Sequence, residues 1–127
     1  MSTDFGNERR RHPRYPIQQP VEGATQGALD VFWGVVRDIS GEGCGLFLDT
    51  HVPPGTPVEV RCNINGIALR LRGQVVWSKP KAEGISEGAL HGIHLTGFAS
   101  EEDALFHRVY LARLSRRAAS SPSRQRQ

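Results

Sequence analysis

The sequence predicts an all-β domain that is closed by a single C-terminal α-helix. Three observations carry this prediction. Short apolar runs follow one another between residues 18 and 98, glycine and proline residues separate these runs, and the one long segment with helical periodicity comes after residue 100. Short strands at close spacing, with no helix between them, indicate a barrel or a sandwich.

Several apolar runs have the composition and period of strands. They are residues 31–36, 44–48, 58–62, 68–77 and 90–95. In residues 68–77, apolar residues from Leu69 to Trp77 alternate with polar ones, so we expect Trp77 to share the buried face. Asn65-Gly66, just before this run, predicts a hairpin.

The last predicted element is a helix that follows Ser100. Ser100 and Asp103 form a Ser-x-x-acid capping pattern, and apolar residues then recur every four positions. The recurring residues are Phe106, Tyr110 and Leu114, with Leu105 and Val109 beside them. We expect this apolar stripe to pack on the strands.

Length and composition are those of one globular domain with two tails. The chain has 127 residues, of which 38% are hydrophobic and 23% are charged. Residues 1–17 are predicted to form a flexible arm, because Pro13 and Pro16 oppose a helix. Residues 18–115 are predicted to form the β-domain with its helix. Residues 116–127, rich in Ser, Pro, Arg and Gln, are predicted to be a disordered basic tail.

Several functional classes are disfavoured. No apolar run approaches the roughly 20 residues of a membrane span, and no signal peptide is visible, so we expect a cytoplasmic protein. Cys44 and Cys62 form no Cys-x-x-Cys pattern and are predicted to be buried thiols. His91 and His94 would point to opposite faces of a strand, so we expect no metal site. No catalytic set is visible, so we expect no enzyme.

The net charge of +3 is unevenly distributed along the chain. Residues 113–127 contain five arginines and no acidic residue, and four further arginines lie within residues 1–17. The body between them is mildly acidic, so we expect no broad nucleic-acid face on the domain.

Two short motifs carry the functional prediction. Arg10 and Arg14 form an Arg-x-x-x-Arg pair in the predicted arm, and Asp38, Ser40 and Gly43 form an Asp-x-Ser-x-x-Gly pattern directly after a predicted strand. Arginine pairs of this spacing arise by chance in an arginine-rich chain, whereas the second pattern is rare. The combination of both motifs with a β-rich body is therefore the informative signal.

With these motifs the chain resembles the PilZ domain family. Residues 8–14 are similar to the family's arginine motif, residues 38–43 to its second motif, and residues 73–77 and 92–95 to its later strands. The resemblance implies a six-stranded antiparallel split β-barrel that binds the bacterial second messenger cyclic di-GMP, with the arm folding over the ligand. The ligand-binding residues that it implies are Arg10, Arg14, Asp38, Ser40 and Gly43, with Arg9 and Arg11 as secondary candidates.

The chemistry of these residue types fits such a ligand. A guanidinium can bind a phosphate through two parallel N–H bonds, and it can also stack on a purine or donate to guanine O6 and N7. Asp38 could accept from guanine N–H groups, and the Ser40 hydroxyl can donate or accept. Gly43 would let the backbone approach the ligand or take a positive φ.

We therefore expect a binding module without a cofactor that passes the cyclic di-GMP signal to a downstream partner protein. The sequence leaves open the identity of that partner and whether the chain is a monomer or a homodimer. One alternative is a scaffold of the same fold that binds proteins but no nucleotide. Another is a small nucleic-acid-binding barrel that uses its basic ends, which would bind in a steeply salt-dependent manner.

Overall fold

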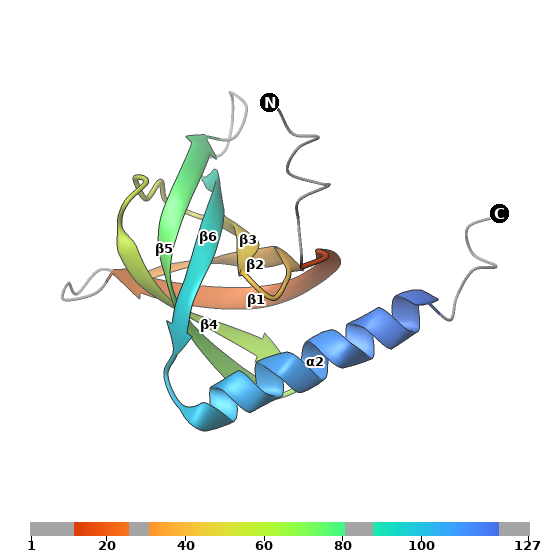
Figure 1. Cartoon of the computed structure of the whole chain (residues 1–127). Helices are drawn as coiled ribbons and strands as arrows, with labels where there is room; N and C mark the ends of the chain where they lie inside the picture. Colours follow the sequence, from red (N-terminus) through yellow and green to blue (C-terminus); the bar gives the residue numbers. More distant parts are fainter. Residues whose placement is uncertain (1–11, 26–30, 81–87, 120–127) are drawn as a thin grey trace, which may run out of the picture.

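In the computed structural model, six antiparallel strands form a closed β-barrel with one helix beside it (Figure 1). The structure describes residues 12–25, 31–80 and 88–119. The elements are β1 (Tyr15–Thr25), β2 (Val31–Ile39), β3 (Gly43–Leu48), β4 (Pro57–Ile64), β5 (Ile67–Pro80), β6 (Ala89–Phe98) and α2 (Glu101–Ala119). Their order around the barrel is β1-β2-β3-β6-β5-β4, and β1 pairs with β4 to close it. The predicted fold class is confirmed.

Alternating side chains fill the barrel. Strand β4 shows the pattern plainly, because every second residue from Val58 to Ile64 is buried and the residues between them are exposed. The inward side chains of the strands meet in one apolar core. Cys44 and Cys62 belong to this core as free thiols, as predicted. Burial raises the pKa of the Cys62 thiol to about 12, so it packs as a small apolar group.

The β4–β5 hairpin forms where the Asn-Gly pair predicts it. Asn65 has a φ of 53° and Gly66 a φ of 86°, as a two-residue type I′ turn requires. The Asn63 carboxamide oxygen accepts a 3.1 Å hydrogen bond from the Gly66 amide, and Ile64 pairs with Ile67 across the turn.

Strand β1 begins inside the segment that was predicted to be the flexible arm. Tyr15 pairs with Ile39 and Pro16 with Asp38, so residues 15–17 belong to the barrel. The register shifts between Pro16 and Gln19, which accommodates a proline that cannot donate to the ladder. Tyr15 and Ile17 pack against the core, and this burial outweighs the poor strand propensity of the two prolines.

Helix α2 begins at the predicted cap and ends at Ala119, four residues beyond the predicted end at 115. The Ser100 hydroxyl accepts a 3.2 Å bond from the Asp103 amide and donates a 2.7 Å bond to the Asp103 carboxylate. Among the described residues, no helix combines the length and the apolar composition that a membrane span requires.

The helix packs on the barrel through the predicted Phe106, Tyr110 and Leu114, but the two apolar residues predicted beside them remain exposed. Leu105 and Val109 are 52% and 47% exposed, whereas Asp103, His107 and Leu114 are buried. The remaining contact residues, Phe106, Tyr110 and Leu111, are partly buried against the core. The rotation of the helix is set at its first turn, where Asp103 binds strand β5, and the apolar stripe is therefore only partly used.

A bulge turns the end of β5 outward. The pairing with β6 shifts between Val75 and Trp77, and both Val76 and Trp77 are exposed. The prediction that Trp77 shares the buried face with Val75 is therefore wrong, because a bulge adds one residue and reverses the alternation beyond it.

Candidate functional site

The 38–43 segment forms a tight turn between β2 and β3, and Ser40 is its centre. The Ser40 hydroxyl accepts hydrogen bonds from the amides of Glu42 and Gly43, at 3.1 and 3.2 Å. The Ser40 amide donates to the Gly43 carbonyl at 2.9 Å. Since Ser40 is only 3% exposed, its side chain is used to hold the turn together.

Gly43 is required by the packing of strands β3 and β6. A Cβ atom at this position would collide with the carbonyl oxygen of Ile93 on the neighbouring strand. Its φ is not in the left-handed region, so the close approach of two backbones explains the glycine.

The end of the N-terminal arm lies against this turn. A Cβ atom at Gly41 would collide with the imidazole ring of His12, so the two residues are in close contact. Two residues further along, the Arg14 Nη1 atom lies 3.6 Å from the Asp38 Oδ1 atom. The structure therefore brings the second arginine of the first motif onto the aspartate of the second motif.

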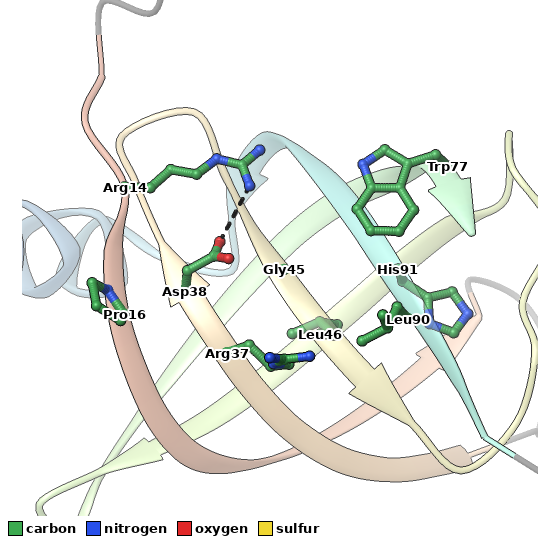
Figure 2. A pocket seen from close by; sticks show the side chains of 9 residues that line it. All are labelled: Arg14, Pro16, Arg37, Asp38, Gly45, Leu46, Trp77, Leu90 and His91. Carbon is green, nitrogen blue, oxygen red and sulfur yellow. Dashed lines mark ion pairs between the residues drawn. The ribbon is translucent and has the colours of Figure 1, made fainter. Parts of the chain in front are cut away.

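Arg14 and Asp38 stand at one end of a surface pocket of about 460 Å³ (Figure 2). Strand β3 lies across the middle of the pocket with Gly45 and Leu46, and the far end is formed by Trp77 with the neighbouring strand β6. The lining residues are Arg14, Pro16, Arg37, Asp38, Gly45, Leu46, Trp77, Leu90 and His91.

Asp38 presents an unsatisfied acceptor in this pocket. Its Oδ1 atom is buried and has no hydrogen-bond partner within the described ranges, and the contact with Arg14 is longer than a hydrogen bond. Gly45, paired with Asp38 across the β2–β3 ladder, leaves the room in which the carboxylate lies. The side chain as a whole is 29% exposed, so the carboxylate is open to a ligand that donates hydrogen bonds.

Arg37 provides a second guanidinium at the pocket. In a regular strand, Arg37 and Asp38 would point to opposite faces. The β2–β3 register shifts between Val36 and Asp38, and both Arg37 and Asp38 line the pocket. Sequence reasoning missed Arg37 because the position of this bulge is not encoded in a local motif.

Trp77 closes the other end of the pocket. Its indole lies over Gly92, since a Cβ atom there would collide with the ring. The residue is 42% exposed, and its ring points toward the pocket (Figure 2). An indole that rests on a backbone and keeps part of its surface open is suited to stacking with a planar group.

His91 forms a buried wall of the pocket and is fully covered. Its Nε2 atom accepts a 2.9 Å hydrogen bond from the Val52 amide, which requires an unprotonated Nε2. Burial lowers the pKa of His91, so the neutral imidazole is favoured.

The structure unites only part of the predicted site. Arg14 and Asp38 meet at the pocket, whereas Ser40 and Gly43 shape the adjoining turn and are not among the pocket-lining residues. Arg9, Arg10 and Arg11 lie outside the described residues. Within the described ranges, no three His, Cys, Asp or Glu side chains cluster as a metal site would require.

The pocket-lining residues that sequence reasoning did not assign to a ligand are Pro16, Arg37, Gly45, Leu46, Trp77, Leu90 and His91. A direct sequence signal exists only for Trp77, because a tryptophan at the end of a strand is able to stack with a planar ligand. The others depend on the barrel geometry.

A family model described as the PilZ domain matches residues 8–111. No curated protein sequence matches the chain. Among solved structures, the PilZ domain of CeSA from a cellulose-synthesizing bacterium is 20% identical, with a TM-score of 0.58, and the match covers 81% of this chain and 98% of that one.

Two further structures have the same fold. The PilZ domain of YcgR from Escherichia coli, solved with c-di-GMP, is 16% identical, with a TM-score of 0.60 and coverage of 89% of this chain and 98% of that one. The inhibitor of motility MotI/DgrA from Bacillus subtilis is 13% identical, with a TM-score of 0.65. That match covers 89% of this chain and 53% of MotI, so this chain spans about half of it.

Proposed function

Because this chain belongs to the PilZ domain family, we propose that it binds cyclic di-GMP in the pocket between Arg14 and Trp77 and acts as a receptor without catalysis. The solved PilZ domain of YcgR with c-di-GMP supports the choice of ligand. The observation that carries the proposal in this chain is the Arg14–Asp38 pair at one end of the pocket.

Charge and hydrogen bonding at that pair match the ligand. Cyclic di-GMP has two phosphodiester groups and two guanines. Arg14 and Arg37 offer guanidinium groups for the phosphates or for guanine O6 and N7. The Asp38 carboxylate, whose side chain is 29% exposed, would accept from guanine N–H groups.

The far end of the pocket suits a guanine face. Trp77 offers an exposed indole above Gly92, and the partly buried Leu90 supplies an apolar surface in the same pocket. Stacking of one base on an aromatic ring contributes about 1–3 kcal/mol. We expect one guanine to stack on Trp77 and the polar groups at Asp38 to fix the orientation of the ligand.

The test of this end of the site is a comparison of two tryptophan variants. Trp77→Ala should weaken cyclic di-GMP binding, measured by isothermal titration calorimetry, by roughly 1–3 kcal/mol. Trp33→Ala is the matched control, because Trp33 is also exposed on the barrel surface but does not line the pocket. Equal affinities of the two variants would contradict the proposed place of the guanine.

The proposed receptor passes its signal to a partner protein. The exposed Leu105 and Val109 on the outer face of α2 support a protein contact there. The same two residues favour the alternative function, in which the chain is a scaffold that binds proteins but no nucleotide. Absence of heat on titration with cyclic di-GMP, for a folded parent protein, would favour the scaffold.

A further inference from the structure

A buried histidine connects helix α2 to the 38–43 turn. The His107 Nε2 atom lies 3.1 Å from the backbone carbonyl oxygen of Ser40, 67 residues away in the sequence. His107 is 5% exposed, and its ring lies against Phe98 with 5.1 Å between the ring centroids. Such a contact joins two segments that no sequence motif relates.

The chemistry of the contact fixes the role of each atom. A carbonyl oxygen only accepts, so the His107 Nε2 atom must carry the hydrogen. Burial lowers the pKa of His107, although the hydrogen bond to Ser40 opposes this effect, so the neutral imidazole with its hydrogen on Nε2 is favoured. Phe98 packs against the ring and limits its rotation.

The accepting residue is the centre of the turn. The Ser40 amide and hydroxyl are already used to bind Glu42 and Gly43, and the carbonyl is held from outside the turn by His107. Asp38 stands two residues earlier, at the pocket. A displacement of the Ser40 carbonyl therefore changes both the turn and the approach to Asp38.

The same helix is attached to the barrel at its first turn. The Asp103 carboxylate accepts hydrogen bonds from the backbone amide and the guanidinium of Arg70, at 2.9 and 3.1 Å. Helix α2 is therefore attached through Asp103 to strand β5, away from the pocket. Four residues later it is attached through His107 to the 38–43 turn, which lies beside the pocket.

We propose that His107 is a positioning residue for the 38–43 turn and the contact through which occupation of the pocket reaches helix α2. The second half of the inference rests on the proposed nucleotide function, and the first half does not. A ligand that binds Asp38 shifts the turn, the Ser40 carbonyl moves relative to the imidazole, and the hydrogen bond to the helix is weakened or lost. By linkage, a partner whose affinity for α2 changes when the pocket is occupied changes the affinity of the pocket for its ligand by the same factor.

The first experiment uses the free protein. Amide hydrogen exchange, measured by NMR, is compared among the parent, His107→Phe and His107→Gln. Phenylalanine keeps the packing against Phe98 and removes the donor, whereas glutamine restores an N–H donor. We expect faster exchange of the Glu42 and Gly43 amides in His107→Phe and near-parent exchange in His107→Gln. Unchanged exchange in a folded His107→Phe variant would overturn the positioning role.

The second experiment adds cyclic di-GMP to the same proteins. We expect His107→Phe to bind about 3- to 10-fold more weakly, the range that one hydrogen bond supplies, and His107→Gln to bind within about 3-fold of the parent. Nucleotide should alter exchange of the α2 amides in the parent and in Arg108→Ala, a control at an exposed neighbouring position, but not in His107→Phe.

The outcomes separate the two proposals. If the parent does not bind cyclic di-GMP, the proposed function and the coupling both fail, and exchange in the free protein still decides the positioning role. If the parent binds and α2 responds equally in His107→Phe, the proposed function stands and the coupling through His107 is overturned.

Discussion

At Gly43 the backbones of β3 and β6 approach so closely that a methyl group has no space. A Cβ atom there would meet the Ile93 carbonyl, which is a rigid part of the barrel. A side-chain tip can rotate away from such a collision, whereas a paired backbone cannot. The motif glycine therefore contributes to the fold directly, whatever it contributes to a ligand.

We predict that Gly43→Ala lowers the free energy of unfolding by about 1–3 kcal/mol, the usual cost of overpacking. Gly97→Ala is the matched control on β6, because no atom of the described residues, apart from its chain neighbours, lies within 4 Å of the Cβ position there. It should change stability by less than about 1 kcal/mol. Urea denaturation of the three proteins measures the difference, and similar midpoints for both variants would contradict this reason for the glycine.

Helix α2 depends on polar anchors as much as on its apolar residues. Burial raises the pKa of Asp103, but hydrogen bonds from Ser100 and Arg70 outweigh this effect and hold the pKa below its usual value. The carboxylate thus caps the helix and binds strand β5 at once. Its position decides which face of α2 meets the barrel.

We predict that Asp103→Ala destabilises the protein by about 1.5–3 kcal/mol, because it removes charge-assisted hydrogen bonds and leaves the Arg70 amide without its acceptor. Glu102→Ala is the control in the same turn of the helix, where the side chain is exposed, and should cost less than about 1 kcal/mol. Thermal and urea unfolding report both values. Equal losses of unfolding free energy in the two variants would show that only the negative charge in the first turn of the helix matters, and would contradict the anchoring role of Asp103.

The strands and the helix differ in how far the sequence predicts them. Asn65-Gly66 predicts its hairpin and Ser100 its cap, since both are local and depend on neighbouring residues. The exposure of Trp77 and the place of Arg37 at the pocket both depend on β-bulges. A bulge forms where pairing with another strand takes up an extra residue. No local pattern contains that information.

The candidate site was predictable to a similar degree. Arg14 and Asp38 follow from two motifs, and the barrel brings them to 3.6 Å. The pocket itself joins residues of β1, β2, β3, β5 and β6, so His91 and Leu90 enter it only when the barrel closes. Ser40 stays a predicted ligand contact, and in the structure its hydroxyl accepts hydrogen bonds from the Glu42 and Gly43 amides of its own turn.

The whole molecule contains two buried imidazoles that make its stability depend on pH. Burial lowers the pKa of His91 and of His107 below the ordinary value. The unfolded chain then binds more protons than the folded one near that value, so stability rises with pH there. The stability that depends on neutral His91 and His107 is fully present above a pH of about 6.5, and it is lost as the pH falls through and below that value.

We predict a lower free energy of unfolding at about pH 5.5 than at about pH 7.5, with a smaller difference in His107→Gln, which has one buried imidazole fewer. The stability that ionised Asp103 contributes is lost only below a pH of about 4, which lies outside the range between these two pH values. Urea titrations at the two pH values measure the difference. Equal stability at both, or greater stability at the lower pH, would refute the assignment.

The most direct test of the account is isothermal titration of the protein with cyclic di-GMP beside Arg14→Ala and Arg61→Ala. Arg61 is the matched control, because it also pairs with a carboxylate on the barrel surface, 3.5 Å from Glu22, but lies away from the pocket. We predict that the parent binds with micromolar or higher affinity. Arg61→Ala should bind within about 2-fold of the parent, whereas Arg14→Ala should lose about 2–5 kcal/mol of binding free energy. Arg14→Ala binding as tightly as the parent, or a folded parent that binds nothing, would contradict the proposed receptor.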